Sequence, residues 1–133
     1  MAELPEVQSL LSHRGQWLLL DEITELGEDH ITATATFSPE QVEGHFPGQP
    51  VVPGVLLLEA LAQCMACLHV LRERKAEAPP ATPFLAGFEK VRFKAPVLPP
   101  ATVRLSVRLV EQRFGLVTAK GQVSLDGRRV VLA

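Results

Sequence analysis

The pattern of apolar and polar positions predicts one long helix with strands on either side of it in the sequence. The longest apolar run lies within residues 51–71, and the helix is expected to run from 55 to 77. Its first half is apolar on nearly every face, which is typical of a helix covered by other structure. Residues 17–37 have the pattern of two strands joined by a turn at 27–29. The helix should therefore lie at the centre of the fold.

Strands alone are predicted after the helix. The proline-rich stretch 78–83 should end the helix and act as a short stiff linker within one domain. The dipeptide Asp126-Gly127 is a strong hairpin signal before the last strand. The remaining predicted elements are a helix at 7–11, a turn or helix start at 38–40, and strands at 84–94, 102–110, 116–125 and 130–132. The pattern predicts a single α+β domain over residues 1–133, with a curved antiparallel sheet wrapped around the central helix.

Composition and charge argue against some classes of function. The chain has 133 residues, 47% of them hydrophobic, and a formal net charge of −2, which gives no sign of nucleic-acid binding through bulk charge. Residues 1–6 contain no basic stretch followed by an apolar core, so a cytoplasmic protein is expected. The apolar helix carries Glu59, Gln63 and His69, which a membrane-spanning helix would hardly tolerate. We therefore expect a buried core helix and no membrane partner.

Two cysteines, Cys64 and Cys67, form a Cys-x-x-Cys pair in the middle of this helix. A redox pair normally sits at a helix N-terminus, where the helix dipole lowers the pKa of a thiol. The chain has no second cysteine pair to complete a zinc site. We expect both cysteines to be buried packing residues, and we expect no metal site.

The stretch from His45 to Glu59 is the most informative part of the chain. A single histidine lies in a loop with three prolines, and the apolar helix that follows carries a single acid. Proline restricts φ, so the loop should hold one shape, and an unpaired carboxylate inside a protein is costly. A preset imidazole and a buried carboxyl are the ingredients of acid-base catalysis. The structural alternatives are a non-catalytic His45 and an ion pair between Glu59 and Arg14.

These residues also resemble the active-site signature of the (3R)-hydroxyacyl-acyl-carrier-protein dehydratases, specifically the FabZ type. The resemblance covers nearly the whole chain and includes residues 11–14, 86–97 and 126–127. Its core is the motif His45-Phe46-Pro47-Gly48-x-Pro50-Val51-x-Pro53-Gly54, followed by Glu59-Ala60-x-Ala62-Gln63. It implies a hot-dog fold, at least a homodimer and often a trimer of dimers, with the histidine of one subunit facing the acid of the other.

The resemblance also implies roles for individual residues. His45 would remove a proton from C2 of the 3-hydroxyacyl thioester, and Glu59 would protonate the departing C3 hydroxyl. Gly54 and Val55, at the helix N-terminus, would bind the thioester oxygen, because the free N–H groups and the dipole of a helix N-terminus favour developing negative charge. Gln63 lies at i+4 from Glu59, where its amide can orient the carboxyl. No cofactor or metal is needed.

Two further sets of residues are assigned around this centre. An apolar tunnel for the acyl chain would be lined by Leu56, Leu57, Leu61 and Phe88. A docking patch for the acidic acyl carrier protein would be formed by Lys90, Arg92 and Lys94, which alternate along a predicted strand with Val91 and Phe93 pointing inward. An ordinary solvated strand face is the alternative for these three basic residues.

Departures from the family pattern affect the tunnel more than the chemistry. The chain has Gly15-Gln16 where the family usually has Tyr-Pro, and it contains no tyrosine at all, so a tyrosine gate is absent.

Two other functions compete with dehydration. One is a hot-dog thioesterase, which would not need both His45 and Glu59. The other is a non-catalytic acyl-thioester binding module, which would be expected to lose one of them.

Overall fold

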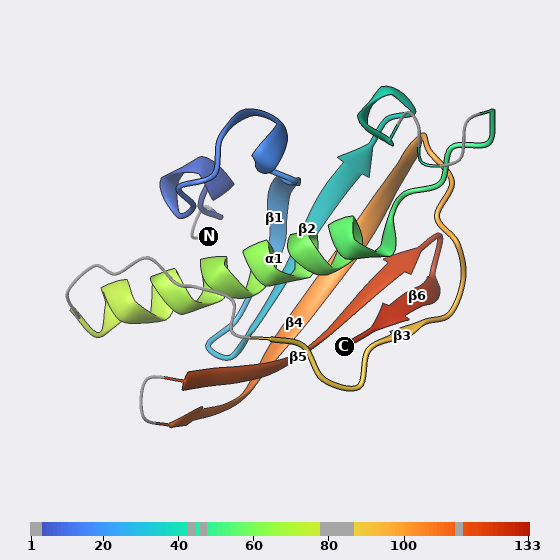
Figure 1. The fold of residues 1–133 in the computed structure, drawn as a ribbon. Coiled ribbons are helices and arrows are strands. Elements are labelled where there is room, and N and C mark those ends of the chain that lie inside the picture. The colour runs from blue at the N-terminus through green and yellow to red at the C-terminus, as the bar shows by residue number, and fades with distance from the viewer. Residues whose placement is uncertain (1–3, 43–44, 46–47, 78–86, 114–115) are drawn as a thin grey trace.

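In the computed structural model, one long helix lies across a curved six-stranded antiparallel sheet (Figure 1). The structure describes residues 4–42, 45, 48–77, 87–113 and 116–133. The helix α1 spans Gly54–Lys75. The strands are β1 (Leu20–Leu26), β2 (His30–Phe37), β3 (Arg92–Phe93), β4 (Ala101–Arg113), β5 (Leu116–Leu125) and β6 (Arg128–Leu132), in the order β1-β2-β4-β5-β6-β3. The described residues also form three short 3-10 helices, η1 (Val7–Ser9), η2 (Gly15–Trp17) and η3 (Glu40–Val42).

The core lies between α1 and the face of the sheet that it covers. Strand β2 turns Ile31, Ala33, Ala35 and Phe37 toward the helix, following the period-two alternation of its sequence. The two alanines leave room for large helix side chains to approach the sheet. The buried apolar residues of α1 are Leu57, Ala60, Leu61, Cys64, Cys67 and Leu68.

Glycine also brings the helix close to the sheet at one point on β5. A Cβ atom at Gly121 would lie 3.1 Å from Leu61 Cδ2, which is tighter than ordinary van der Waals contact. The absence of a side chain at this position therefore lets Leu61 pack directly onto the strand backbone.

The helix α1 is long and apolar enough to cross a membrane by length and composition alone. It packs against β1, β2, β4 and β5, however, and 39% of its most apolar window is buried inside the fold. This packing agrees with the core helix that the sequence predicted.

Most predicted elements are confirmed, but the strand expected at 84–94 is largely wrong. Within the described part of that range the only strand is β3, which pairs with β6 over two residues. Lys90 has a φ of 54°, which interrupts an extended backbone. Phe93 is 54% exposed rather than inward-facing. The helix expected at 7–11 is the 3-10 turn η1, β4 continues three residues beyond its predicted end, and the linker at 78–83 lies outside the described residues.

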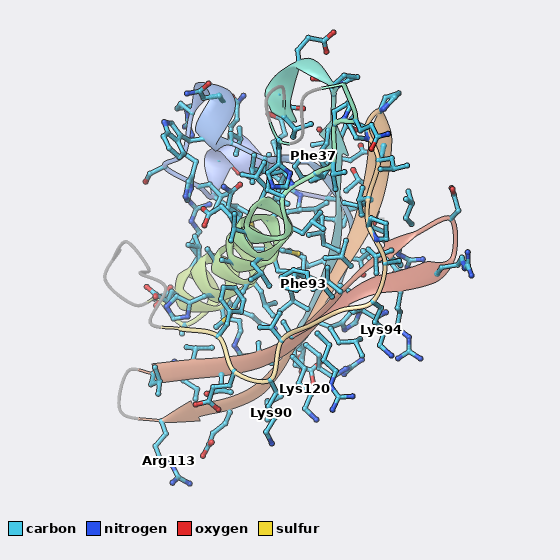
Figure 2. The ribbon with its side chains drawn as sticks, turned by 45° about the vertical axis from the view of Figure 1, so that its right-hand side comes forward. Phe37, Lys90, Phe93, Lys94, Arg113 and Lys120 are labelled. Carbon is cyan, nitrogen blue, oxygen red and sulfur yellow. The ribbon has the colours of Figure 1, made fainter. Side chains whose placement is uncertain are left out.

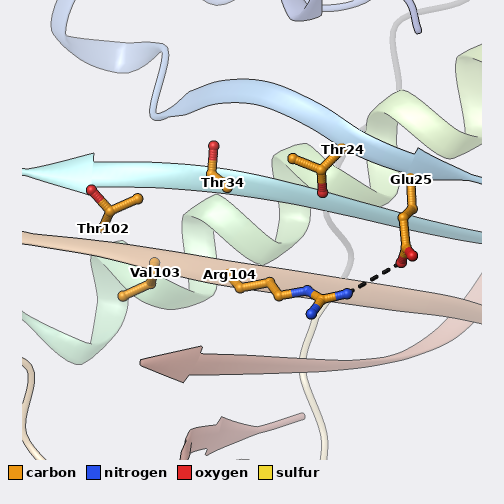
Figure 3. Close-up of a pocket in the computed structure, with 6 residues that line it drawn as sticks. All are labelled: Thr24, Glu25, Thr34, Thr102, Val103 and Arg104. Atoms are coloured by element: carbon orange, nitrogen blue, oxygen red, sulfur yellow. Dashed lines mark hydrogen bonds and ion pairs between the residues drawn. The ribbon is translucent and has the colours of Figure 1, made fainter. Parts of the chain in front are cut away.

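The face of the sheet away from α1 is polar, as is common where an antiparallel sheet covers its core on one side only. Thr36 Oγ1 donates to Asp21 Oδ2 over 2.6 Å and lies 3.0 Å from Thr102 Oγ1. Nearby, Arg104 Nη2 lies 3.2 Å from Glu25 Oε2. A shallow hollow on this face is shown in Figure 3 and is lined by Thr24, Glu25, Thr34, Thr102, Val103 and Arg104.

The two cysteines are buried in the core, as predicted, and both are free thiols. Burial, reinforced by neighbouring Cys67, raises the pKa of the Cys64 thiol far above its usual range, and burial raises the pKa of Cys67 to about 12. A thiol with a raised pKa in the folded state keeps its proton at a pH where the unfolded chain loses it. The buried, protonated thiols therefore make their full contribution to the stability of the fold below pH 9, and this contribution is lost as the pH rises toward 12.

We accordingly expect the free energy of unfolding to fall above pH 9 by about 1.4 kcal/mol per pH unit for each thiol. Urea unfolding of the wild-type chain at several pH values between 8 and 11 would measure this slope. The variant Cys64→Ala/Cys67→Ala keeps all other titrating groups, so the slope should be smaller in the variant. Equal slopes in the two chains would contradict the prediction.

Candidate active site

The loop that carries His45 is closed by hydrogen bonds between its two ends. The His45 N–H donates to the Val42 carbonyl over 3.0 Å, and the Val51 N–H donates to the His45 carbonyl over 3.2 Å. The loop is in turn held to the chain before β4, because the Val52 N–H donates to the Val97 carbonyl over 2.9 Å. These bonds link His45 to Val42 and Val51, and they link the end of the loop to the chain before β4.

The ring of His45 is held by the same loop. Its Nδ1 atom lies 2.8 Å from the Val51 carbonyl oxygen. A carbonyl oxygen can only accept a hydrogen bond, so we assign the ring proton to Nδ1. In the neutral ring, Nε2 then carries the lone pair, which is the arrangement that a general base requires.

The N-terminus of α1 begins directly after this loop. Pro53 is the N-cap residue and makes no side-chain capping bond. The first N–H groups of a helix, here those of Gly54 and Val55, have no acceptor within the helix itself. Gly54 is also in close contact with the ring of Phe93, because a Cβ atom at Gly54 would lie 2.5 Å from Phe93 Cε1. The phenyl ring therefore occupies the space beside the helix N-terminus.

The carboxyl of Glu59 lies in the second turn of α1 and is less buried than the sequence predicted. Its side chain is 39% exposed in this single chain. The carboxyl lies on the flank of the helix toward the chain before β1, and Oε1 is 3.5 Å from His13 Nε2. The ion pair considered between Glu59 and Arg14 is wrong, because the Arg14 guanidinium donates instead to the carbonyls of Gln8, Leu11 and His13.

Gln63 connects Glu59 to the segment that precedes β1. Its Nε2 donates to Glu59 Oε1 over 3.2 Å, so the contact predicted from their i, i+4 spacing is present. The same amide donates to the Trp17 carbonyl over 2.7 Å and accepts from the Leu19 N–H over 3.0 Å. Gln63 is only 1% exposed, and these backbone partners explain how a polar side chain is accommodated there.

Replacing Gln63 by leucine should therefore destabilise the fold as well as release Glu59. The substitution leaves a buried N–H at Leu19 and the Trp17 carbonyl without their partner, at a cost of about 1–3 kcal/mol for an unsatisfied buried group. Urea unfolding would measure the loss. Met65→Leu, a volume-conserving change on the same helix, is the control and should cost clearly less. Equal stability losses would contradict the bridging role of Gln63.

His13 is the site residue that sequence reasoning missed. Its neighbour Arg14 anchors the N-terminal segment through bonds to the carbonyls of Gln8, Leu11 and His13. The contact between His13 and Glu59 joins residues 46 positions apart, so neither periodicity nor spacing indicates it. The one available signal was that residues 11–14 belong to the stretch that resembles the dehydratase pattern.

The residues predicted to line an acyl tunnel have different environments. Leu57 and Leu61 are buried in the core, whereas Leu56 is partly buried at its margin. Phe88 is partly buried in the chain before β3. A second hollow is lined by residues from β1, β2, β4, β5 and the C-terminal residues, and neither hollow includes one of the four predicted tunnel residues.

The predicted docking residues Lys90, Arg92 and Lys94 are all exposed. The Lys94 N–H donates to the Val130 carbonyl over 2.8 Å, so this segment runs beside β6, which carries exposed Arg128 and Arg129. Figure 2 shows Lys90 and Lys94 projecting away from α1, together with Lys120 of β5. We call the set Lys90, Arg92, Lys94, Lys120, Arg128 and Arg129 the basic edge.

Comparison with known proteins assigns the chain to a family. The model of the FabA-like domain matches residues 11–133. A 3-hydroxyacyl-[acyl-carrier-protein] dehydratase FabZ from Clostridium perfringens is 39% identical over 96% of this chain and 91% of its own length. The protein of the same name from Streptococcus pyogenes serotype M49 is 35% identical over the same shares.

Solved structures support the fold. The dehydratase heterocomplex ApeI:P from Xenorhabdus doucetiae has a TM-score of 0.83 at 17% identity, covering 98% of this chain and 88% of that chain. A hypothetical thioesterase with coenzyme A from Streptococcus pneumoniae has a TM-score of 0.61 at 13% identity, over 84% and 78%. At these identities the likeness concerns the fold alone. The hot-dog architecture is thus confirmed, and the chain belongs to the FabA-like family, with the FabZ-type dehydratases as its curated relatives.

Proposed function

We propose that this chain catalyses the reversible dehydration of (3R)-hydroxyacyl-acyl carrier protein to trans-2-enoyl-acyl carrier protein in type II fatty-acid biosynthesis. It would act as a soluble cytoplasmic hydro-lyase without a cofactor. The observation that carries the proposal is the 39% identity to a FabZ dehydratase across nearly the whole chain. The held orientations of His45 and Glu59 are what such a reaction would use.

His45 acts as the base in this scheme. Its Nε2 lone pair takes the proton from C2 of the substrate, and the Val51 carbonyl supports the Nδ1–H as positive charge develops on the ring. The electron pair left at C2 is stabilised by delocalisation into the thioester carbonyl. The N–H groups of Gly54 and Val55 at the start of α1 donate to that oxygen, where negative charge accumulates.

Glu59 acts as the acid. Its protonated carboxyl gives a proton to the C3 hydroxyl as the C3–O bond breaks, so that water rather than hydroxide leaves. The C2 pair becomes the new double bond between C2 and C3. Gln63 holds the carboxyl through Oε1. Buried Leu57 and Leu61, with Leu56 and Phe88, are the residues we assign to the acyl chain.

We further propose that the site is completed in a homodimer, and that three such dimers form a trimer of dimers. The FabA-like family is oligomeric, and the surface around the N-terminus of α1 is apolar in the single chain. Val55 is 70% exposed, Phe93 54% and Leu98 60%. A second copy covering this surface would remove apolar area from water and would also enclose Glu59.

A thioesterase is the competing activity, and the two reactions leave different products. Hydration of a crotonyl thioester consumes the enoyl absorbance without releasing thiol, whereas thioester hydrolysis releases free thiol. The first experiment therefore follows both signals with crotonyl-acyl carrier protein and with crotonyl-coenzyme A. Loss of absorbance without thiol supports the proposal, thiol release supports a thioesterase, and no reaction on either carrier favours a binding module.

The basic edge is the proposed docking surface for the acidic carrier protein. The double reversal Lys90→Glu/Lys94→Glu should raise the KM for crotonyl-acyl carrier protein by about tenfold, because like charges then meet at the interface. The KM for crotonyl-coenzyme A should change much less. Arg113→Glu, at the far end of β4 (Figure 2), is the matched control on the same sheet. Equal KM changes for the reversal and the control would contradict the docking role of the basic edge.

A further inference from the structure

Two donors approach the same oxygen of Glu59. Gln63 Nε2 lies 3.2 Å from Oε1, and His13 Nε2 lies 3.5 Å from the same atom. No described residue makes a hydrogen bond or ion pair with Oε2. The two carboxyl oxygens are therefore in different environments, one facing two nitrogen atoms and the other facing away from them.

The orientation of the His13 ring indicates which nitrogen carries the proton. Its Nδ1 atom is buried and has no hydrogen-bond partner among the described residues. A buried N–H without an acceptor is costly, so we assign the proton of the neutral ring to Nε2. Nε2–H is then the group 3.5 Å from Glu59 Oε1, a polar contact beside the hydrogen bond from the amide of Gln63.

The backbone that carries His13 is held in place independently of Glu59. Arg14 Nη1 donates to the Leu11 and His13 carbonyls over 2.6 Å each, and Nη2 donates to the Gln8 carbonyl over 3.0 Å. The guanidinium thus closes the turn that presents His13 to α1. The segment that follows this turn is attached to the helix through Gln63, which donates to the Trp17 carbonyl.

We propose that His13 is a positioning residue that selects Oε2 of Glu59 as the oxygen bearing the transferable proton. The inference rests on the dehydratase function proposed above. An oxygen that accepts the Gln63 N–H and lies 3.5 Å from His13 Nε2 is a poor site for a proton, because the proton would meet these N–H groups in a repulsive contact. The O–H bond of Glu59 therefore forms at Oε2. In the dehydration step this bond breaks, its proton joins the C3 hydroxyl, and water leaves.

Two substitutions at position 13 distinguish a positioning role of His13 from a role in packing alone. His13→Phe keeps a ring of similar size but removes the donor, and His13→Gln removes the ring but places an amide N–H near the position of Nε2. We expect His13→Phe to lower kcat by about ten- to a hundredfold with KM within about twofold, since a misplaced catalytic group costs turnover. We expect His13→Gln to recover most of this loss.

The solvent deuterium isotope effect on kcat provides a readout that a merely structural role would not change. When the acid is misoriented, delivery of its proton limits turnover, so the isotope effect should be larger in His13→Phe than in the wild type. Urea unfolding of both variants checks that the fold is retained. Wild-type kcat in His13→Phe, or an equal kcat loss in His13→Gln, would overturn the role of His13 while leaving the dehydratase intact. An inactive wild-type chain would overturn the proposed function itself.

Discussion

Replacing His45 by alanine should lower the kcat for hydration of crotonyl-acyl carrier protein by about 10²- to 10⁴-fold, the contribution expected of a positioned general base or acid. In the hydration direction the imidazolium returns the proton to C2, so the same residue is needed in both directions. The backbone bonds that close the loop do not involve the ring, so the His45→Ala chain should keep its loop and its fold. KM should change little, because the imidazole binds the reacting hydrogen rather than the acyl chain.

The control for this prediction is His69→Ala. His69 lies on α1 but forms an i, i+4 ion pair with Glu73 farther along the helix, so its removal should leave kcat unchanged. Enoyl absorbance measures turnover in both variants, and circular dichroism compares their folds. Near-normal turnover by His45→Ala would show that another group removes the C2 proton.

The local pattern of the sequence was sufficient to predict the core of the fold. Residues 30–37 alternate strictly, and β2 has the predicted bounds with its apolar side chains turned to α1. The hairpin signal Asp126-Gly127 joins β5 to β6, and both residues have the positive φ that such a turn requires. These features depend on neighbours in the sequence, which is why alternation and turn chemistry reveal them.

The edge of the sheet could not be predicted in the same way. The alternation around Phe93 suggested an inward-facing ring, but the ring instead lies beside Gly54, on a different element of the fold. A glycine at the start of a helix leaves a space that the sequence alone does not assign to any side chain. Local periodicity therefore gave the wrong orientation where a contact between distant segments decides it.

In the candidate site, too, local contacts could be predicted from the sequence and contacts between distant segments could not. The i, i+4 contact between Glu59 and Gln63 follows from helix geometry and was predictable. The burial expected for Glu59 depends on what covers that flank of α1, and one chain leaves the carboxyl 39% exposed. His13 lies beside Glu59 where Arg14 closes the turn before it and Gln63 binds the segment after it to the helix. Each of these contacts joins segments that no single-sequence pattern links.

Replacing Glu59 by glutamine should lower kcat for crotonyl-acyl carrier protein by a similar 10²- to 10⁴-fold, because an amide cannot exchange the proton that the hydroxyl requires. The amide oxygen can still accept the bond from Gln63 and keep its contact with His13, so the geometry should be retained. Enoyl absorbance again gives the rate. Glu73→Gln, in the last turn of α1 and paired with His69, is the matched control and should leave kcat unchanged. Full activity in Glu59→Gln would assign the acid role elsewhere.

The two inactive variants together test whether the site is shared between subunits. If His45 of one protomer faces Glu59 of the other, a heterodimer of His45→Ala and Glu59→Gln chains contains one site with both wild-type residues. Random mixing makes about half of the dimers heterodimers, so about a quarter of wild-type activity per chain should return after subunit exchange. A site built within one chain would recover nothing, because every site in every dimer would then lack one of the two residues. The regain of activity therefore tests whether two subunits share the site, and not only the role of His45 or of Glu59.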